Sequence, residues 1–263
     1  MDPQFLQSIL IALAVGLASG SIGAFIILKR MALVGDAFSH VALPGIALAL
    51  LYHFDPWLGV VVFLLGAALL VWWLEGKTAL PVEGIVGILF VASLSVGILI
   101  IPDADIAESL FGEFSLMSAP ALVLFLSLAC LFIFVSYFLA QRLTFLAISE
   151  ELASVSKIGS RYNLLFLIIF ALIVSLGIKL VGTLLMGALT IIPPLIAKNI
   201  GRTIKGYMIL SSLIGAAIAV SGVSIARYYG FLPGPAIVLL GVFIFILSLP
   251  FVKIHPIREL PAK

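Results

Sequence analysis

The sequence predicts an all-α integral membrane protein, and its composition, its long apolar runs and the placement of its basic residues lead to that class. Of the 263 residues, 63% are hydrophobic and only 10% are charged, whereas soluble domains carry roughly 25% charged residues. The mean hydropathy is +1.35. Because a span needs about 20 apolar residues, most of the chain is required for spans. We therefore expect one polytopic domain over residues 1–263.

Apolar runs between charged or turn-forming clusters predict nine membrane-spanning helices. We expect them near residues 4–28, 33–52, 57–74, 82–101, 119–140, 162–178, 181–197, 206–226 and 235–252. The run from Leu164 to Ala197 is too long for one span. We place the turn of a tight hairpin there at Lys179, between Gly177 and Gly182. The first run lacks the basic flank of a signal peptide, so we expect it to be retained.

The basic residues predict the orientation, because cytoplasmic loops of membrane proteins are enriched in Lys and Arg. With nine spans and an outer N-terminus, 12 of the 14 Lys and Arg residues fall on the cytoplasmic side, and only Lys179 and Arg227 fall outside. The reverse orientation inverts this ratio. We therefore expect the N-terminus outside and the C-terminus in the cytoplasm. The formal net charge of +2 gives no indication of nucleic-acid binding.

Two loops hold many of the remaining charges. The outer loop after the fourth span contains Asp103, Asp105 and Glu108, with Glu113 beyond. These acids are ordinary solvated charges, a mildly cation-attracting entrance, or a docking rim for a partner protein. The inner stretch 141–161 is the longest hydrophilic segment, and Ser149 is a suitable N-cap within it. We expect a short cytoplasmic helix parallel to the membrane. Such a helix is either a simple connector or a surface for a partner.

Small residues and prolines occur within several of the predicted spans. Gly16 and Gly20 form a G-x-x-x-G pattern on the first span, which we interpret as close helix packing. The pair Pro193-Pro194 is expected to break the seventh span, and Pro233 lies at the opening of the ninth. Proline in a span requires that the freed carbonyls find other partners. We therefore expect these prolines to face the protein interior.

The second span contains an ionisable pair, Asp36 and His40, that is costly in hydrocarbon and needs a functional reason. At a spacing of four the two side chains share a helix face, with Ser39 one i,i+3 step from Asp36. Pro44 lacks the N–H that would bond the His40 carbonyl, so this carbonyl is left free near the imidazole. Two interpretations stay open: transient binding of a divalent metal, or a buried Asp–His hydrogen bond that fixes helix packing.

One copy of this pair supplies too few ligands for a closed metal site. A two-fold pair of chains would bring two carboxylates and two imidazoles together, enough for four-coordinate zinc. Carboxylate and imidazole suit zinc, manganese or ferrous iron better than cuprous copper. The single cysteine, Cys130, excludes a thiolate-rich site and an intrachain disulfide.

The other residues considered are weaker candidates for a functional role. His53 and His255 are expected to be solvated, and Glu83 at the start of the fourth span is a cap, an interfacial charge or a further residue of the pathway. The stretch Gly76-Lys77-Thr78 resembles the end of a nucleotide-binding loop, but it follows no strand and Val71 replaces the first glycine. We find no catalytic motif and expect no enzyme activity. Any energy for pumping then comes from another chain or from an ion gradient.

Several runs together resemble the permease family of zinc/manganese/iron ATP-binding-cassette transporters. The most specific is the G-D-x-x-S-H-x-x-L-P-G pattern of residues 35–45. Further similar runs are Glu83–Phe90, Leu110–Gly112, Val181–Leu189 with Ile191–Pro193, and Leu232–Pro235. The resemblance covers nearly the whole chain. Pro194, where a small residue is usual, and Glu113, a longer acid than usual, depart from the pattern and put the metal preference in doubt.

The resemblance implies a function, partners and site residues. Such permeases are homodimeric or paired, take a metal ion from an extracytoplasmic binding protein and are driven by cytoplasmic ATPase subunits. They lie in the cytoplasmic (inner) membrane of prokaryotes, hold no permanent cofactor, and move zinc, manganese or iron. The metal-contacting Asp and His fall on Asp36 and His40. The ATPase-coupling helix falls on residues 145–159, with the residues Glu150, Glu151, Ala153 and Gly159.

Two functions of other classes remain as alternatives. In a gradient-driven secondary transporter, Asp36 and His40 would relay protons or metal without an ATPase. An intramembrane enzyme would need catalytic motifs, which the sequence lacks. We therefore expect the permease subunit of an ATP-driven metal importer.

Overall fold

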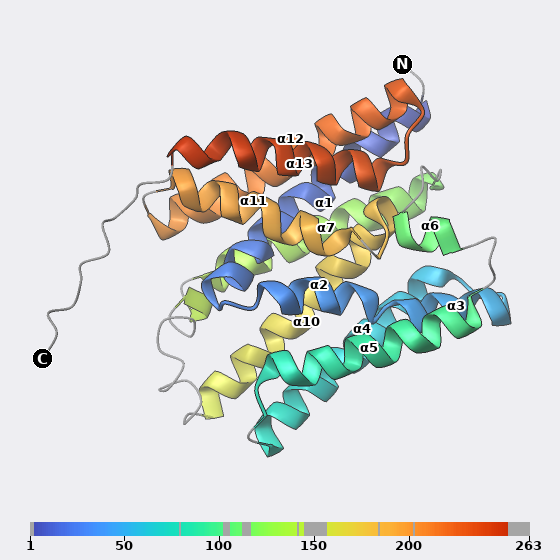
Figure 1. Ribbon diagram of the computed structural model, residues 1–263, viewed down its shortest axis with the longest axis vertical. Helices are drawn as coiled ribbons and strands as arrows, with labels where there is room; N and C mark the ends of the chain where they lie inside the picture. Colours follow the sequence, from blue (N-terminus) through green and yellow to red (C-terminus); the bar gives the residue numbers. More distant parts are fainter. Residues whose placement is uncertain are drawn as a thin grey trace, which may run out of the picture.

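The computed structural model describes residues 3–78, 80–101, 106–111, 117–140, 142–144, 157–183, 185–201 and 203–251. Within them the protein is helical and contains no strand, which confirms the all-α class (Figure 1). Seven of the described helical segments are long and apolar enough to cross a membrane, and two apolar helices are shorter.

The helices follow the predicted spans closely. Their bounds are α1 (Pro3–Leu28), α2 (Ala32–His40), α3 (Leu43–Tyr52), α4 (Pro56–Lys77), α5 (Val82–Ile100), α6 (Ile106–Phe111), α7 (Ala119–Phe138), α10 (Lys157–Val181), α11 (Met186–Ile200), α12 (Ile204–Tyr229), α13 (Pro233–Ser248) and the 3₁₀ turn η2 (Leu249–Phe251). Together α2 and α3 occupy the second predicted span. The shorter α11 and α13 occupy the seventh and ninth.

The predicted turn at Lys179 is wrong. α10 continues to Val181, and the chain turns at Gly182, which has a left-handed φ of 80° that glycine adopts without steric cost. Lys179 is exposed in the last turn of α10. A lysine there favours the helix, because its charge complements the negative end of the helix dipole and its stem can reach toward a polar surface.

The predicted break at Pro193-Pro194 is also wrong, since both prolines lie inside the continuous helix α11. Both are buried, as expected. Pro194 offers no N–H to the Thr190 carbonyl, and that carbonyl lies so close to Gly23 of α1 that a β-carbon on Gly23 would overlap it. The close approach of α1 therefore covers the freed carbonyl, and α11 stays helical through the prolines.

The G-x-x-x-G pattern of α1 packs against α12, which confirms its interpretation as a packing motif. A β-carbon on Gly16 would lie 2.7 Å from the Cα of Ala216, and one on Gly20 would lie 2.7 Å from the Cα of Ser212. The Ser211 hydroxyl donates to the Gly20 carbonyl at 2.6 Å. Backbones this close gain dispersion contacts that larger side chains would prevent.

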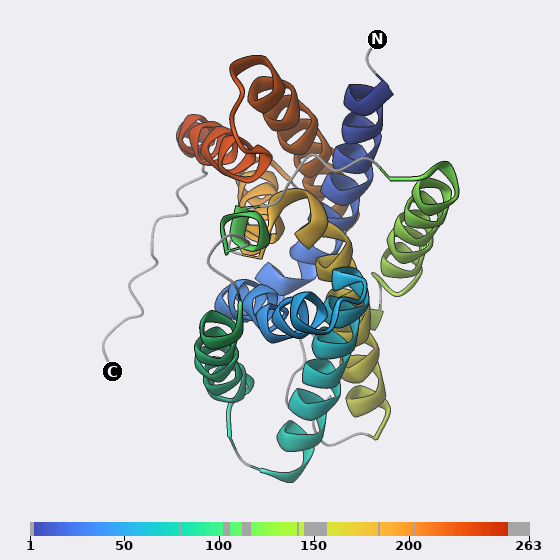
Figure 2. The ribbon, with the colours of Figure 1, turned by 90° about the vertical axis from the view of Figure 1, so that its right-hand side faces the viewer.

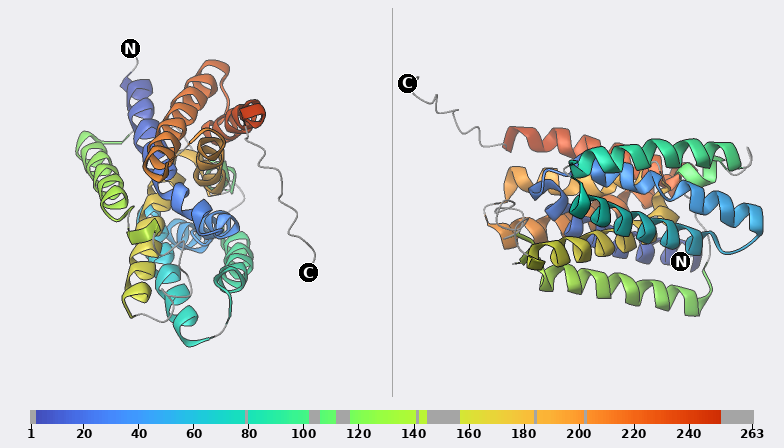
Figure 3. Two further views of the ribbon diagram at one scale, coloured as in Figure 1. Left: turned by 90° about the vertical axis from the view of Figure 1, so that its left-hand side faces the viewer. Right: turned by 90° about the horizontal axis from the view of Figure 1, so that it is seen from below.

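The helices of the bundle differ in how far they are buried. α1 and α10 are mostly buried, whereas α5 and α7 bury few of their side chains and leave many apolar ones exposed. Figure 2 and Figure 3 show α5 and α7 on opposite sides of the bundle. Exposed apolar faces on outer helices fit a protein whose solvent is the hydrocarbon of a bilayer. Cys130 is a free, exposed residue of α7.

The α1–α12 contact generates a stability prediction. Gly16→Leu places a side chain into the backbone of α12, so we expect a loss of roughly 3 kcal/mol or more of stability, at the upper end for overpacked cores. Gly66→Leu is the matched control, because a β-carbon at Gly66 meets nothing within 4 Å. Thermal unfolding followed by size-exclusion chromatography in detergent measures both variants. Equal stability of the two would contradict the packing assignment.

Candidate metal site

The candidate site lies on α2, which ends inside the second span. The chain leaves α1 through Arg30, whose φ is 60°, and α2 ends at His40 before α3 begins at Leu43. At the junction Val41 N–H donates to the Phe38 carbonyl at 3.2 Å and Ala42 N–H to the Ser39 carbonyl at 3.4 Å. These are i→i+3 bonds of a tightened turn. The helix is therefore irregular at Val41 and Ala42, although Ala32–Tyr52 as a whole is still one apolar helical segment long enough to cross a membrane.

The His40 imidazole is buried, with 5% of the residue exposed. Its Nδ1 atom is buried and has no hydrogen-bond partner among the described residues. The ring meets Phe90 of α5 edge-on, with 5.0 Å between the centroids. A buried nitrogen without a partner costs free energy unless something binds it. The alternative of an Asp–His hydrogen bond through Nδ1 is therefore not realised.

The Asp36 carboxylate is half-buried and is backed by Gly187 of α11. A β-carbon on Gly187 would lie 2.6 Å from the Cα of Asp36 and would overlap its Oδ1 atom. The sequence places Gly187 in one of the similar runs but gives it no role. Only the fold shows that this glycine leaves room for the carboxylate.

The other predicted site residues contribute in different ways. The buried Ser39 hydroxyl donates to the Asp36 backbone carbonyl at 2.7 Å, so it supports the helix turn that carries the pair. Pro44 is buried at the second position of α3. Glu83 is exposed in the first turn of α5, about 10 Å by helical rise from Phe90. The exposed His53 closes α3, as expected for a solvated histidine.

One copy of the chain brings few metal ligands together. Within the described ranges, no group of three or more His, Cys, Asp or Glu side chains could hold a metal ion. One carboxylate and one imidazole on adjacent turns of α2 are what this part of the chain offers. A complete coordination shell needs ligands from elsewhere.

The predicted coupling residues fall mostly outside the described part of the chain. Glu150, Glu151 and Ala153 lie outside the described residues, as do His255 and the acidic residue Glu113. Gly159 lies in the first turn of α10. The predicted coupling helix 145–159 therefore does not end at residue 159 as a separate helix, because α10 has already begun at Lys157.

The fold and this site define a class of protein: an all-helical membrane permease that keeps an ionisable pair at a break in one span. More narrowly, the chain belongs to the ABC 3 transport family, whose model matches residues 1–252.

Relatives of similar length support the family assignment. The chain is 30% identical over 253 residues to the manganese import system permease protein ScaB of Streptococcus gordonii, covering 94% of this chain and 91% of that protein. It is 28% identical over 252 residues to the high-affinity zinc uptake system membrane protein ZnuB of Haemophilus influenzae, covering 92% of this chain and 95% of that protein.

Solved structures match the whole bundle. A chain of PsaBC from Streptococcus pneumoniae, in complex with Fab, superposes with a TM-score of 0.80 at 29% identity, covering 96% of this chain and 92% of that chain. An inward-facing putative metal-chelate type ABC transporter superposes with a TM-score of 0.76, at 22% identity and over 93% of this chain and 85% of that chain. The second match shows the fold alone.

The contact between Gly187 and Asp36 generates a prediction about metal affinity. Gly187→Ala displaces the carboxylate without removing it, and residues that orient metal ligands usually change affinity by about 10- to 100-fold. We expect a loss in that range, measured as the metal concentration for half-maximal uptake. Gly84→Ala is the control, because its β-carbon makes an ordinary 3.6 Å contact with Pro81. Unchanged affinity in Gly187→Ala would show that the carboxylate does not bind the metal.

Proposed function

We propose that this chain is the transmembrane permease subunit of an ATP-driven importer that moves zinc, manganese or iron into the cytoplasm. The observation that carries the proposal is the Asp36–His40 pair at the end of α2, with a buried imidazole nitrogen that has no partner among the described residues. The family and the relatives that import manganese or zinc support it.

The chemistry of the pair suits a divalent transition metal as cargo. A carboxylate oxygen and a neutral imidazole nitrogen form a mixed ligand set that binds zinc, manganese and ferrous iron. Ionisable side chains of this kind are expensive to keep in a membrane without a function. Beside the site, Pro44 lacks the N–H that would bond the His40 carbonyl, so this carbonyl is available to an ion. Irregular turns within spans coordinate cations in this way in other transporters.

We further propose that two copies of the chain complete the site around a two-fold axis. Asp36 and His40 from each copy would give two carboxylates and two imidazoles, the number that four-coordinate zinc requires. Each subunit alone would then hold the metal weakly, and the site would form and open as the two copies move against each other.

The energy would come from cytoplasmic ATP-binding-cassette ATPase subunits, and an extracytoplasmic metal-binding protein would deliver the ion. The sequence contains no nucleotide site of its own, so the permease would not be an enzyme. Residues 145–159, with Glu150, Glu151, Ala153 and Gly159, would form the contact with the ATPase. The chain would lie in the inner membrane of a prokaryote.

We further propose nine crossings with the C-terminus in the cytoplasm; bonds between helix ends that this topology puts on the same side support the order of the crossings, and the basic residues support the orientation. At the outer side, the Gln7 side-chain amide donates to the Met117 carbonyl at 2.8 Å, and the Thr183 hydroxyl donates to the Ser109 carbonyl at 3.1 Å. At the inner side, Asn199 of α11 donates to the hydroxyl of Ser248 in α13 at 2.9 Å.

The site residues generate the main functional prediction. Asp36→Ala and His40→Ala should each lower metal uptake by about 100-fold or more, because each removes a ligand directly. His53→Asn is the control, since His53 is exposed with a left-handed φ of 57° that asparagine tolerates. Radiotracer metal uptake into proteoliposomes that contain the assembled transporter measures all three. Wild-type uptake in either site variant would reduce the pair to a packing role.

Dependence on ATP separates the proposal from a gradient-driven transporter. Metal uptake should require the ATPase subunits and hydrolysable ATP, and metal-loaded binding protein should stimulate hydrolysis. Uptake that persists without any ATPase, or that collapses when a proton gradient is removed, would favour the secondary transporter instead.

The coupling loop has its own test. Glu151→Lys reverses the charge of a predicted ATPase contact, so transport should fall while the metal site stays intact. Co-purification of the ATPase and metal binding to the complex are measured together. Normal association and normal transport in this variant would argue against residues 145–159 as the coupling segment.

A further inference from the structure

Three helix ends meet at a polar contact around Asn163, which follows the predicted coupling segment, residues 145–159, in the sequence. Lys29 at the end of α1 donates to the Oδ1 atom of Asn163 at 2.6 Å, and the Nδ2 atom of Asn163 donates to Glu75 of α4 at 2.6 Å. All three side chains are partly buried. Asn163 thus uses both ends of its amide to join the first turns of α10 to the last turns of α1 and α4.

The start of α10 is held by two more contacts. The indole N–H of Trp72 in α4 donates to the Ser160 carbonyl at 3.0 Å. The Arg142 guanidinium hydrogen-bonds the Tyr162 hydroxyl and lies over its ring, 5.1 Å from the centroid. Arg142 precedes residues 145–156 and Tyr162 follows them. These contacts therefore bring together the two flanks of the predicted coupling segment, next to Asn163.

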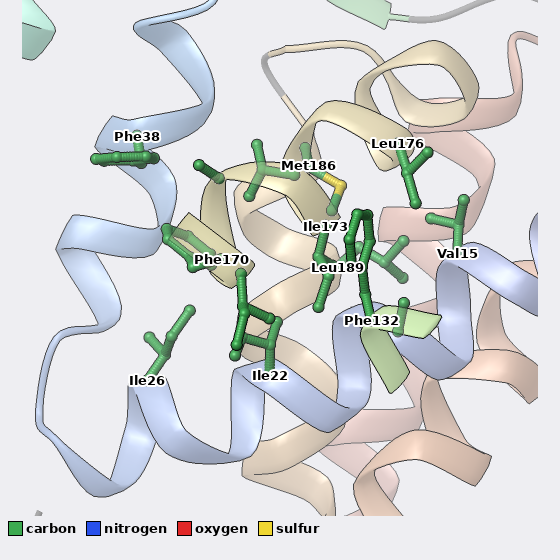
Figure 4. Packing of buried hydrophobic residues seen from close by; sticks show 14 of the residues in the cluster. Val15, Ile22, Ile26, Phe38, Phe132, Phe170, Ile173, Leu176, Met186 and Leu189 are labelled. Atoms are coloured by element: carbon green, nitrogen blue, oxygen red, sulfur yellow. The ribbon is translucent and has the colours of Figure 1, made fainter. Parts of the chain in front are cut away.

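The same face of α10 continues from Asn163 to the metal-bearing helix. Asn163, Phe166 and Phe170 follow one another at spacings of three and four, so they share a helix face. The Lys29 ammonium lies 4.8 Å from the centroid of Phe166. Phe166 and Phe170 stack with 6.4 Å between centroids, and Phe170 meets Phe38 of α2 at 5.3 Å. Figure 4 shows the Phe170 ring beside Phe38, where α10 faces α2.

Phe38 is placed to control the orientation of the candidate site. It lies midway between Asp36 and His40, so at 3.6 residues per turn its side chain projects from the opposite face of α2. Phe38 is completely buried, and only 1% of the surface of Phe170 is exposed. A shift of α10 along or around its axis would therefore move Phe38 and rotate the two ligands on the other side of the helix.

We propose that α10 links the ATPase-facing segment to the metal-bearing helix, with Asn163 and Phe170 as positioning residues that act on Asp36 and His40 through Phe38. The inference rests on the proposed function, because it assigns a path for the coupling that an ATP-driven permease requires. A densely packed interior transmits such a shift, because its side chains have few alternative arrangements.

The test measures the number of metal ions transported per ATP hydrolysed by the complete transporter in proteoliposomes. Asn163→Ala and Phe170→Leu should each lower this ratio by about 2- to 30-fold, the range over which such network residues change coupling. Basal ATP hydrolysis should persist. The double variant should lose less than the product of the two single effects, because both residues act along one path.

Matched controls separate coupling from stability. Asn199→Ala removes one partly buried side-chain bond at the ends of α11 and α13, and Phe125→Leu trims a buried ring of α7. Both lie outside the path and should keep the wild-type ratio at an equal loss of thermal stability. An unchanged ratio in Asn163→Ala and Phe170→Leu, or an equal fall in the controls, would overturn the inference. A wild-type complex without ATP-driven uptake would instead overturn the proposed function.

Discussion

The interruption of the second span after His40 is the constraint on which the rest of the structure depends. The turn at Val41 and Ala42 keeps its N–H groups bonded, but the His40 carbonyl loses the N–H that Pro44 lacks, and the ionisable pair beside it lies where lipid cannot satisfy it. The structure therefore surrounds α2 with protein: α11 lies against Asp36 through Gly187, and α5 covers His40 with Phe90. These neighbours keep the pair away from lipid and allow it to face a partner or an ion.

Close backbone contacts, more than large apolar side chains, hold this arrangement together. Lipid gives no hydrophobic advantage to helix association, so van der Waals packing must supply much of the energy. Gly16 on Gly215 joins α1 to α12, and Gly45 on Gly59 joins α3 to α4. The second contact fixes α3 just beyond the break. Glycine thus determines where the two halves of the interrupted span can lie.

Much of the fold could be predicted from the sequence, because hydropathy, basic residues and span length act locally. The Asp36–His40 pair was also recognisable, since an i,i+4 carboxylate and imidazole in an apolar run is rare. The turn at Gly182 and the uninterrupted α11 were not, because they depend on tertiary contacts: the bonds from Thr183 to the Ser109 carbonyl, next to Gly182, and the approach of Gly23 to the carbonyl that Pro194 frees. The roles of Gly187 and Phe90 likewise exist only between helices.

The two candidate ligands that the described residues offer suit a site that would bind a metal reversibly. A closed shell of four strong ligands retains its metal, whereas conduction requires binding that is weak enough to be reversed. Here two candidate ligands lie on a short helix, α2, which a tightened turn joins to α3 and which meets α10 at the Phe38–Phe170 ring pair. Such a helix can be reoriented by a small shift of its neighbour without unfolding. The break that makes α2 costly in a membrane is therefore also what would let a partner's motion change its affinity for a metal ion.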